Sequence, residues 1–156
     1  MAMPGTLPVL NKKVVEYETR YCLGQSYIVR EKDIPYLEEC ALILNKGLYQ
    51  GVLLRNTESF RFFQKEEIKG ELVLDNNMYL WNRESCSYWS DKADEYYLPT
   101  EANLGEIKEL LKSTENIDLI PSVLVYGRIP MMVTANCVRK TTGKCSKTPG
   151  ISVLKD

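Results

Sequence analysis

Two cysteines late in the chain have the types and spacing that most suggest chemistry. Cys137 and Cys145 lie outside any apolar period, with Arg139, Lys140 and Lys144 between them. Cationic neighbours stabilise the thiolate, which is the form of cysteine that binds metals. Two thiols cannot complete a four-cysteine cluster or zinc site by themselves. The spacing therefore predicts at most part of a metal site, and a solvated basic loop is the alternative.

The chain contains no histidine among its 156 residues. This removes Ser-His and Cys-His nucleophilic pairs, histidine zinc sites and imidazole general bases. A metal or cluster would have to use thiolates and carboxylates. A self-contained hydrolase would depend on Asp, Glu, Lys or Cys.

A basic segment stands out against the net charge of −1. The stretch 128–155 holds six of the 20 Lys and Arg residues and no Asp or Glu. Such a segment suits an anionic partner such as RNA, with Arg139 and Lys140 as candidate binding residues. The bland alternative is a solvated loop, which is the commoner role of a basic run.

The overall composition is that of an ordinary globular protein, with 44% hydrophobic and 26% charged residues. No apolar run is long enough to span a membrane, and the start "MAMPGTLPVL" lacks the pattern of a secretory signal. We therefore expect a cytoplasmic protein with reduced cysteines and no membrane partner. Cys22, Cys40 and Cys86 lie among apolar residues, which favours a place in the core.

Short apolar runs, each followed by polar residues, predict the elements that would position these side chains. They occupy 49–56, 70–77, 94–101 and 121–128, and an earlier strand is expected at 26–30. Continuous apolar runs of this length are typical of strands buried on both faces of a parallel sheet. We predict an α/β fold: a parallel sheet of βα units forming a partial TIM-like (β/α) barrel. A smaller open α/β sheet is the alternative.

Helix signals fill the gaps between the expected strands. Asp33, Thr57 and Asn82 can each cap a helix, and Asn103 begins a capping-box pattern. Gly47 is placed to end the first of these helices. Strand and helix therefore alternate at the spacing of βα units, which predicts right-handed crossovers.

In parallel α/β folds, ligands bind beyond the carboxyl ends of the strands. The residues at those ends are 55–56, 75–77, 100–101 and 126–128. We expect them to meet at one rim, where the basic cysteine loop begins. The candidate substrate-binding residues are Asn76, Asn77, Asn82, Tyr126, Arg139 and Lys140.

Three side chains near this rim are the candidate catalytic residues. Asp75 could orient a polar ligand or accept a proton, and Glu101 could act as a general base. Arg128, after a glycine, suits carboxylate or phosphate binding. Each has a structural alternative: a turn for Asp75, a favourable helix end for Glu101, and a salt bridge to either acid for Arg128.

Four segments resemble a known family. "VYGRIPMMVTANC" is similar to the Tyr-Gly-Arg-x-Pro-Leu-Met…Cys run of the collagenase-like peptidase family U-32. "LVLDNNMYLWNRESC", "YYLPTEANLGEIKELL" and "GVLLRNTESF" resemble three further stretches of that family. The resemblance covers roughly residues 50 to 156.

The resemblance implies a fragment of a larger protein, cut before its site is complete. We divide the chain into an N-terminal lead-in (1–25), a βα-unit domain (26–136), and a basic cysteine loop that starts a truncated continuation (137–156). Some family members perform oxygen-independent hydroxylation of RNA bases or quinones with a four-cysteine iron–sulfur cluster. Cys137 and Cys145 would supply two ligands of such a 4Fe-4S cluster.

The resemblance therefore implies part of an iron–sulfur-dependent hydroxylation factor acting on RNA or a related substrate. The alternatives are a metal-dependent collagenase-like protease with a peptide substrate, and a noncatalytic binding or scaffold domain. We expect the isolated chain to be inactive and to hold no cofactor. We also expect homo-oligomers, because an incomplete barrel leaves an open sheet edge.

Overall fold

A computed structural model of the chain describes residues 21–127, 129–130, 133, 138–141 and 143. Five strands form one sheet, in which every neighbouring pair is parallel. Their bounds are β1 (Cys22–Gly24), β2 (Gly51–Leu54), β3 (Glu71–Leu74), β4 (Glu95–Tyr97) and β5 (Ile120–Ser122). The α/β class and the parallel sheet of βα units are confirmed.

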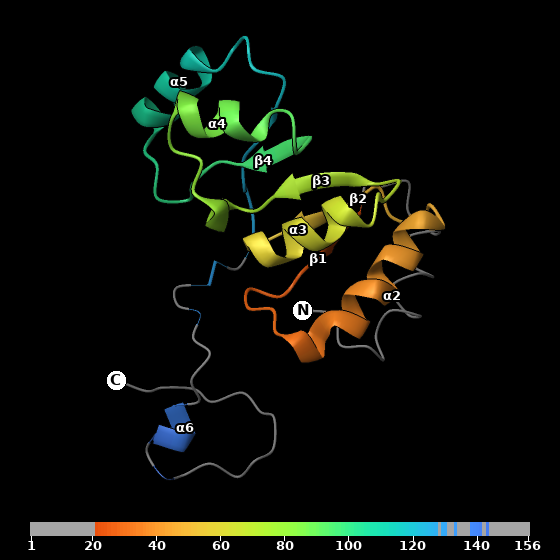
Figure 1. Ribbon diagram of the computed structural model, residues 1–156. Coiled ribbons are helices and arrows are strands. Elements are labelled where there is room, and N and C mark those ends of the chain that lie inside the picture. The colour runs from red at the N-terminus through yellow and green to blue at the C-terminus, as the bar shows by residue number, and fades with distance from the viewer. Residues whose placement is uncertain (1–20, 128, 131–132, 134–137, 142, 144–156) are drawn as a thin grey trace.

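Helices connect the successive strands (Figure 1). Their bounds are η2 (Glu31–Asp33), α2 (Ile34–Asn45), α3 (Thr57–Lys65), η3 (Asn76–Met78), α4 (Arg83–Trp89), α5 (Leu104–Ser113) and α6 (Val138–Thr141). The labels η2 and η3 denote 3-10 helices. In Figure 1, α6 lies apart from the sheet, whereas α2 to α5 lie against it.

The strands stand in the sheet in the same order as in the chain, β1-β2-β3-β4-β5. Right-handed crossovers in this order bring all the helices to one face, as in a (β/α) barrel. The core agrees with this. One apolar cluster unites strand residues such as Leu23, Val52 and Tyr96 with helix residues such as Leu44 and Phe63. The opposite face of the sheet is therefore left for the candidate site.

The register aligns the side chains of that opposite face in rows. Leu53 pairs with Val73, and Val73 pairs with Glu95. Since side chains alternate along a strand, these three lie on the face away from the helix-packed cluster. The next residues on the same face, Arg55 and Asp75, directly follow the last residues of β2 and β3.

Local signals placed most of the helix boundaries correctly. Asn82 caps α4, and Asn103 forms a capping box with Glu106 at the start of α5. Gly47 follows α2 with a φ of 75°, a conformation that favours glycine. The cap of α3 is Asn56 rather than Thr57: its side chain accepts a hydrogen bond from the Ser59 N–H at 2.8 Å.

Two strand predictions were wrong. The first strand is Cys22–Gly24, and 26–30 contains no strand. The fifth strand ends at Ser122, where the predicted strand was expected to start. Beyond it, Val125 and Tyr126 are 88% and 95% exposed, so this apolar run is not buried.

The edge formed by β5 carries a feature that disfavours further pairing. The Ile120 N–H donates to the Asp94 carbonyl at 3.0 Å, and the Leu98 N–H donates to the Ser122 carbonyl at 2.8 Å. Pro121, between them, therefore turns its backbone away from β4, and proline has no N–H to offer a new strand. Self-association through a sheet edge stays a prediction, and β1 is the better edge for it.

Candidate functional site

An ion pair forms at the carboxyl edge of the sheet. Arg55 directly follows β2 and Asp75 directly follows β3, and the register pairs Leu54 with Leu74 just before them. The Arg55 Nε donates to the Asp75 Oδ2 at 2.6 Å. The two side chains are 20% and 10% exposed, so most of this contact is shielded from water.

The guanidinium of Arg55 is fixed by further contacts. Its Nη1 donates to the Gln25 carbonyl at 3.0 Å, and its central carbon lies 4.4 Å from the centre of the Tyr27 ring. A Cβ at Gly24 would lie 3.7 Å from the guanidinium nitrogens, which is an ordinary contact distance and places Gly24 directly beside the arginine. Stacking and hydrogen bonding together hold the arginine in one orientation.

The Asp75 carboxylate is engaged through both oxygens. Its Oδ2 accepts from Arg55, and its Oδ1 accepts from the Asn76 N–H at 2.9 Å, which caps η3. The turn-forming role that was the alternative for Asp75 is therefore present, together with an ion pair. The geometry makes Asp75 a positioning group for Arg55.

A cavity of about 150 Å³ opens beside this pair. One wall is polar and consists of Arg55, Asp75 and Asn76. The remaining lining is mainly apolar or aromatic: Tyr27, Leu53, Tyr97, Leu124, Ile129 and Pro130. A small ligand in this cavity would meet both charged groups and hydrocarbon.

A second cavity, of about 410 Å³, lies next to the first on the same face of the sheet. It shares Leu53 and Tyr97 with the first cavity and adds Cys22, Val73 and Glu95. The Glu95 side chain is buried, and its Oε1 accepts from the Ser122 Oγ at 2.6 Å. The two cavities give the sheet face a charged end and a mostly apolar middle.

The rim continues from Asn76 toward Glu101. The Asn76 Nδ2 donates to the Thr100 Oγ1 at 3.4 Å, and the Thr100 Oγ1 donates to the Glu101 Oε2 at 3.2 Å. Glu101 itself is exposed. Asn77 is half-buried, and its Oδ1 has no hydrogen-bond partner among the described residues. The structure thus gathers the predicted rim residues 75–77 and 101 at one edge.

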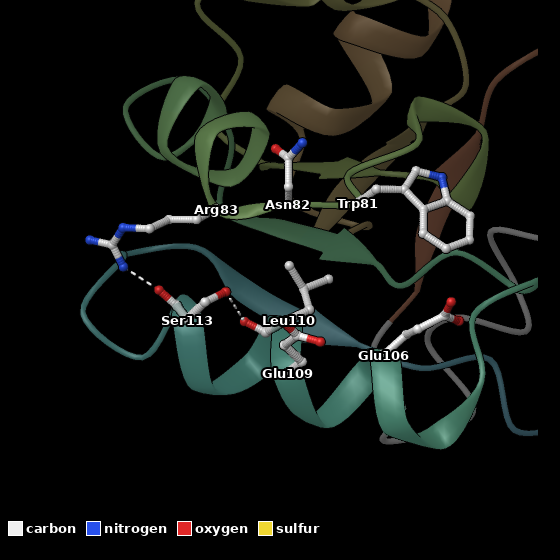
Figure 2. A pocket seen from close by; sticks show the side chains of 7 residues that line it. All are labelled: Trp81, Asn82, Arg83, Glu106, Glu109, Leu110 and Ser113. Atoms are coloured by element: carbon white, nitrogen blue, oxygen red, sulfur yellow. Dashed lines mark hydrogen bonds between the residues drawn. The ribbon is translucent and has the colours of Figure 1, made fainter.

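Asn82 does not join this group. It caps α4 by accepting from the Ser85 N–H at 2.9 Å, and it lines a separate cavity of about 320 Å³ between α4 and α5. Figure 2 shows Arg83 reaching to the Ser113 carbonyl at the end of α5, with Trp81 on the side of Glu106. The role that the geometry gives Asn82 is that of a helix cap.

Two other predicted site residues, Tyr126 and Lys140, are not among the residues that line the cavity. Tyr126 is 95% exposed, and Lys140 is exposed in α6. The predictions for Arg128, Cys137, Cys145 and the side chain of Arg139 concern parts of the chain that lie outside the described residues. Their binding, catalytic and metal-ligating roles stay predictions.

Sequence reasoning gave no role to three residues that form this site. Arg55 stood at a predicted strand end, so its position at the rim could be predicted from the sequence. Its pairing with Asp75 could not. Tyr97 falls inside a run that predicted a strand, and Tyr27 falls in a segment predicted as strand that instead forms the loop after β1. Tyr27 lies three residues beyond the end of β1 at Gly24, and because this strand was predicted elsewhere, no sequence signal placed the ring at the rim.

The three cysteines of the described part, Cys22, Cys40 and Cys86, do not form a metal-binding group. Cys40 and Cys86 are buried in the helix-packed core, as expected, whereas Cys22 is exposed, which corrects its predicted core position. No group of three or more His, Cys, Asp or Glu residues suited to a metal ion occurs within the described part of the chain. The proposed cluster thus depends on Cys137 and Cys145.

Burial should separate the reactivity of these thiols. Burial raises the pKa of the Cys40 and Cys86 thiols, so little reactive thiolate forms at neutral pH. In native protein at pH 7, we expect iodoacetamide to alkylate Cys22 about a hundredfold faster than either buried thiol. Peptide mass mapping over time measures this, and unfolding in urea should equalise the three rates. Equal native rates would contradict the described core.

None of the described helices combines the length and apolar character needed to cross a bilayer. Comparisons with family models, with curated proteins and with solved structures found no match to this chain.

Proposed function

We propose that this chain is the substrate-binding portion of a U-32-type (β/α)-barrel protein and that it holds an anionic group of its substrate against Arg55. The observation that carries this is the Arg55–Asp75 pair at the carboxyl edge of a parallel sheet, 2.6 Å apart and lining a cavity. Ligands of such folds bind at this edge. The family assignment rests on the four sequence segments, and the sequential strand order is compatible with it.

The contacts of Arg55 support a ligand-binding role in addition to its structural role in the ion pair. Arginine offers five N–H donors, and the hydrogen bonds of the described residues use the Nε and one Nη1 N–H. The remaining donors belong to a group that lines an open cavity. Planar, oriented donors of this kind recognise carboxylates and phosphates.

The hydroxylation chemistry remains part of the proposal, and proteolysis is the weaker alternative. Each oxygen of Asp75 accepts a hydrogen bond, one from Arg55 and one from the Asn76 N–H, and this arrangement suits a carboxylate that holds Arg55 in place. Iron–sulfur chemistry would be supplied by a cluster bound through Cys137 and Cys145.

A titration followed by NMR tests the binding role. We expect acetate, inorganic phosphate or a short RNA oligonucleotide to shift the Arg55 Nε–H and Asn76 N–H signals in a saturable way, with dissociation constants on the order of millimolar for the smallest probes. Arg55→Gln should abolish the effect on Asn76. Arg61→Gln is the matched control, because Arg61 is an exposed arginine of α3. If no probe perturbs the Asn76 signal, the proposal is wrong.

A further inference from the structure

The two walls of the Arg55 cavity differ in a way that narrows the class of ligand. Among the described residues that line the cavity, the charged side chains are Arg55 and Asp75. The same lining includes hydrocarbon side chains, among them Leu53 and Leu124. A ligand that fits both walls needs one compact polar group and an apolar body.

Charge decides between the common anions. Among the described residues that line the cavity, the charges of Arg55 and Asp75 cancel. A phosphate monoester carries up to two negative charges near neutral pH; Arg55 offsets one of them, and Asp75 repels the second. Phosphate sites usually add more cations or several backbone N–H groups. A carboxylate brings one charge and matches the planar fork of arginine.

The size of the cavity limits the body. A volume of about 150 Å³ corresponds to roughly five water molecules at about 30 Å³ each. Carbon groups occupy comparable space, so the cavity encloses roughly five non-hydrogen atoms, and a slightly larger ligand would extend through its open side. Burying a branched hydrocarbon against Leu53 and Leu124 would contribute the favourable apolar term.

We propose that this cavity binds a small monocarboxylic acid with a compact, branched aliphatic body. Its carboxylate accepts from the Nη1 and Nη2 groups of Arg55, and its body packs on the side formed by Leu53, Leu124 and Tyr97. This inference rests on the proposed function, because it names the ligand of the same site.

The direct test compares 4-methylpentanoate with two probes that have a similar branched body and a different polar group. These are 4-methylpentanamide, which lacks the charge, and isobutyl phosphate, which carries a larger one. In the full chain at pH 7.5, titration calorimetry or the NMR signals above should give an affinity for 4-methylpentanoate about tenfold or more above that for either probe. Equal or tighter binding of isobutyl phosphate, dependent on Arg55, would overturn the inference and leave the proposed function standing. If none of the three probes binds, both the inference and the proposed function are wrong.

Variants separate the two walls. Leu124→Ser should weaken 4-methylpentanoate but leave acetate unchanged, because acetate has no body to reach the apolar side. Asp75→Asn should shift the preference toward isobutyl phosphate, since it leaves the cavity with one net positive charge. Arg61→Gln should change nothing. Should Arg55→Gln fold poorly, the neutral double variant Arg55→Gln/Asp75→Asn replaces it and is expected to bind none of the acids. Retained carboxylate binding in that double variant would refute the assignment.

Discussion

Asp75→Ala is expected to lower the free energy of unfolding by about 3 kcal/mol. The substitution leaves the Arg55 guanidinium mostly buried, with its Nε unpaired, and removes the oxygen that caps η3. Breaking a shielded pair by deleting one partner costs more than the pair contributes, because the remaining charge keeps its desolvation penalty. Urea denaturation followed by circular dichroism measures the change.

Two comparison variants show whether the missing charge partner causes the loss. The double variant Arg55→Met/Asp75→Leu removes both charges and should recover much of the stability lost in Asp75→Ala. Asp91→Ala breaks the ion pair between Asp91 and Lys92, in which the aspartate side chain is 73% exposed, and should cause no measurable change. If Asp91→Ala and Asp75→Ala lose equal stability, the shielding of the Arg55 pair is not the reason.

The middle of the fold could be predicted because its strands carry apolar side chains on both faces: Leu54 and Leu74 lie in the helix-packed cluster, and Leu53 and Val73 lie on the opposite face. The runs that became β2, β3 and β4 have almost no polar interruptions, and that pattern is diagnostic of strands in parallel sheets. The first strand has no such run: it spans three residues, of which Leu23 alone reaches the helix-packed core. Its assignment depends on pairing with β2, which is a long-range property.

The last strand was displaced for a related reason. The segment 123–126 is as apolar as a buried strand, yet it continues past the end of β4 at Tyr97, where the ladder stops. Apolar character predicts that a segment can be buried. Whether a neighbouring strand reaches far enough to bury it depends on register, which one sequence does not reveal.

The edge that carries the site was predictable, and the partner of Asp75 was not. Asp75 and Asn76 were placed by the rule that ligands bind at carboxyl ends of parallel strands. The predicted alternative paired an acid of this rim with Arg128, whereas the Oδ2 of Asp75 accepts from Arg55, 20 residues earlier. That pairing follows from the register of β2 with β3, which sets Leu54 against Leu74.

The same register makes Gly51 the most sensitive glycine of the sheet. A Cβ at this position would lie 2.5 Å from the backbone oxygen of Glu71 and 3.1 Å from its Cβ, on the strand paired with it. Gly51→Ala must push β2 from β3 at the start of their ladder, because the nearest obstacle is backbone and cannot rotate away. We expect a loss of about 2–3 kcal/mol in urea denaturation.

Gly47 provides the matched control for Gly51→Ala. A side chain at position 47 meets no steric obstacle, so any loss there comes from backbone conformation. No atom lies within 4 Å of a Cβ built there, and its φ is 75°. Gly47→Ala should therefore lose about 1 kcal/mol from backbone conformation. Gly47→Asn should lose less, since asparagine tolerates the left-handed region. Gly51→Asn, in contrast, should be no better than Gly51→Ala, because its obstacle is steric. Rescue of position 51 by asparagine would mean that conformation, and not the close approach of β3, selects glycine there.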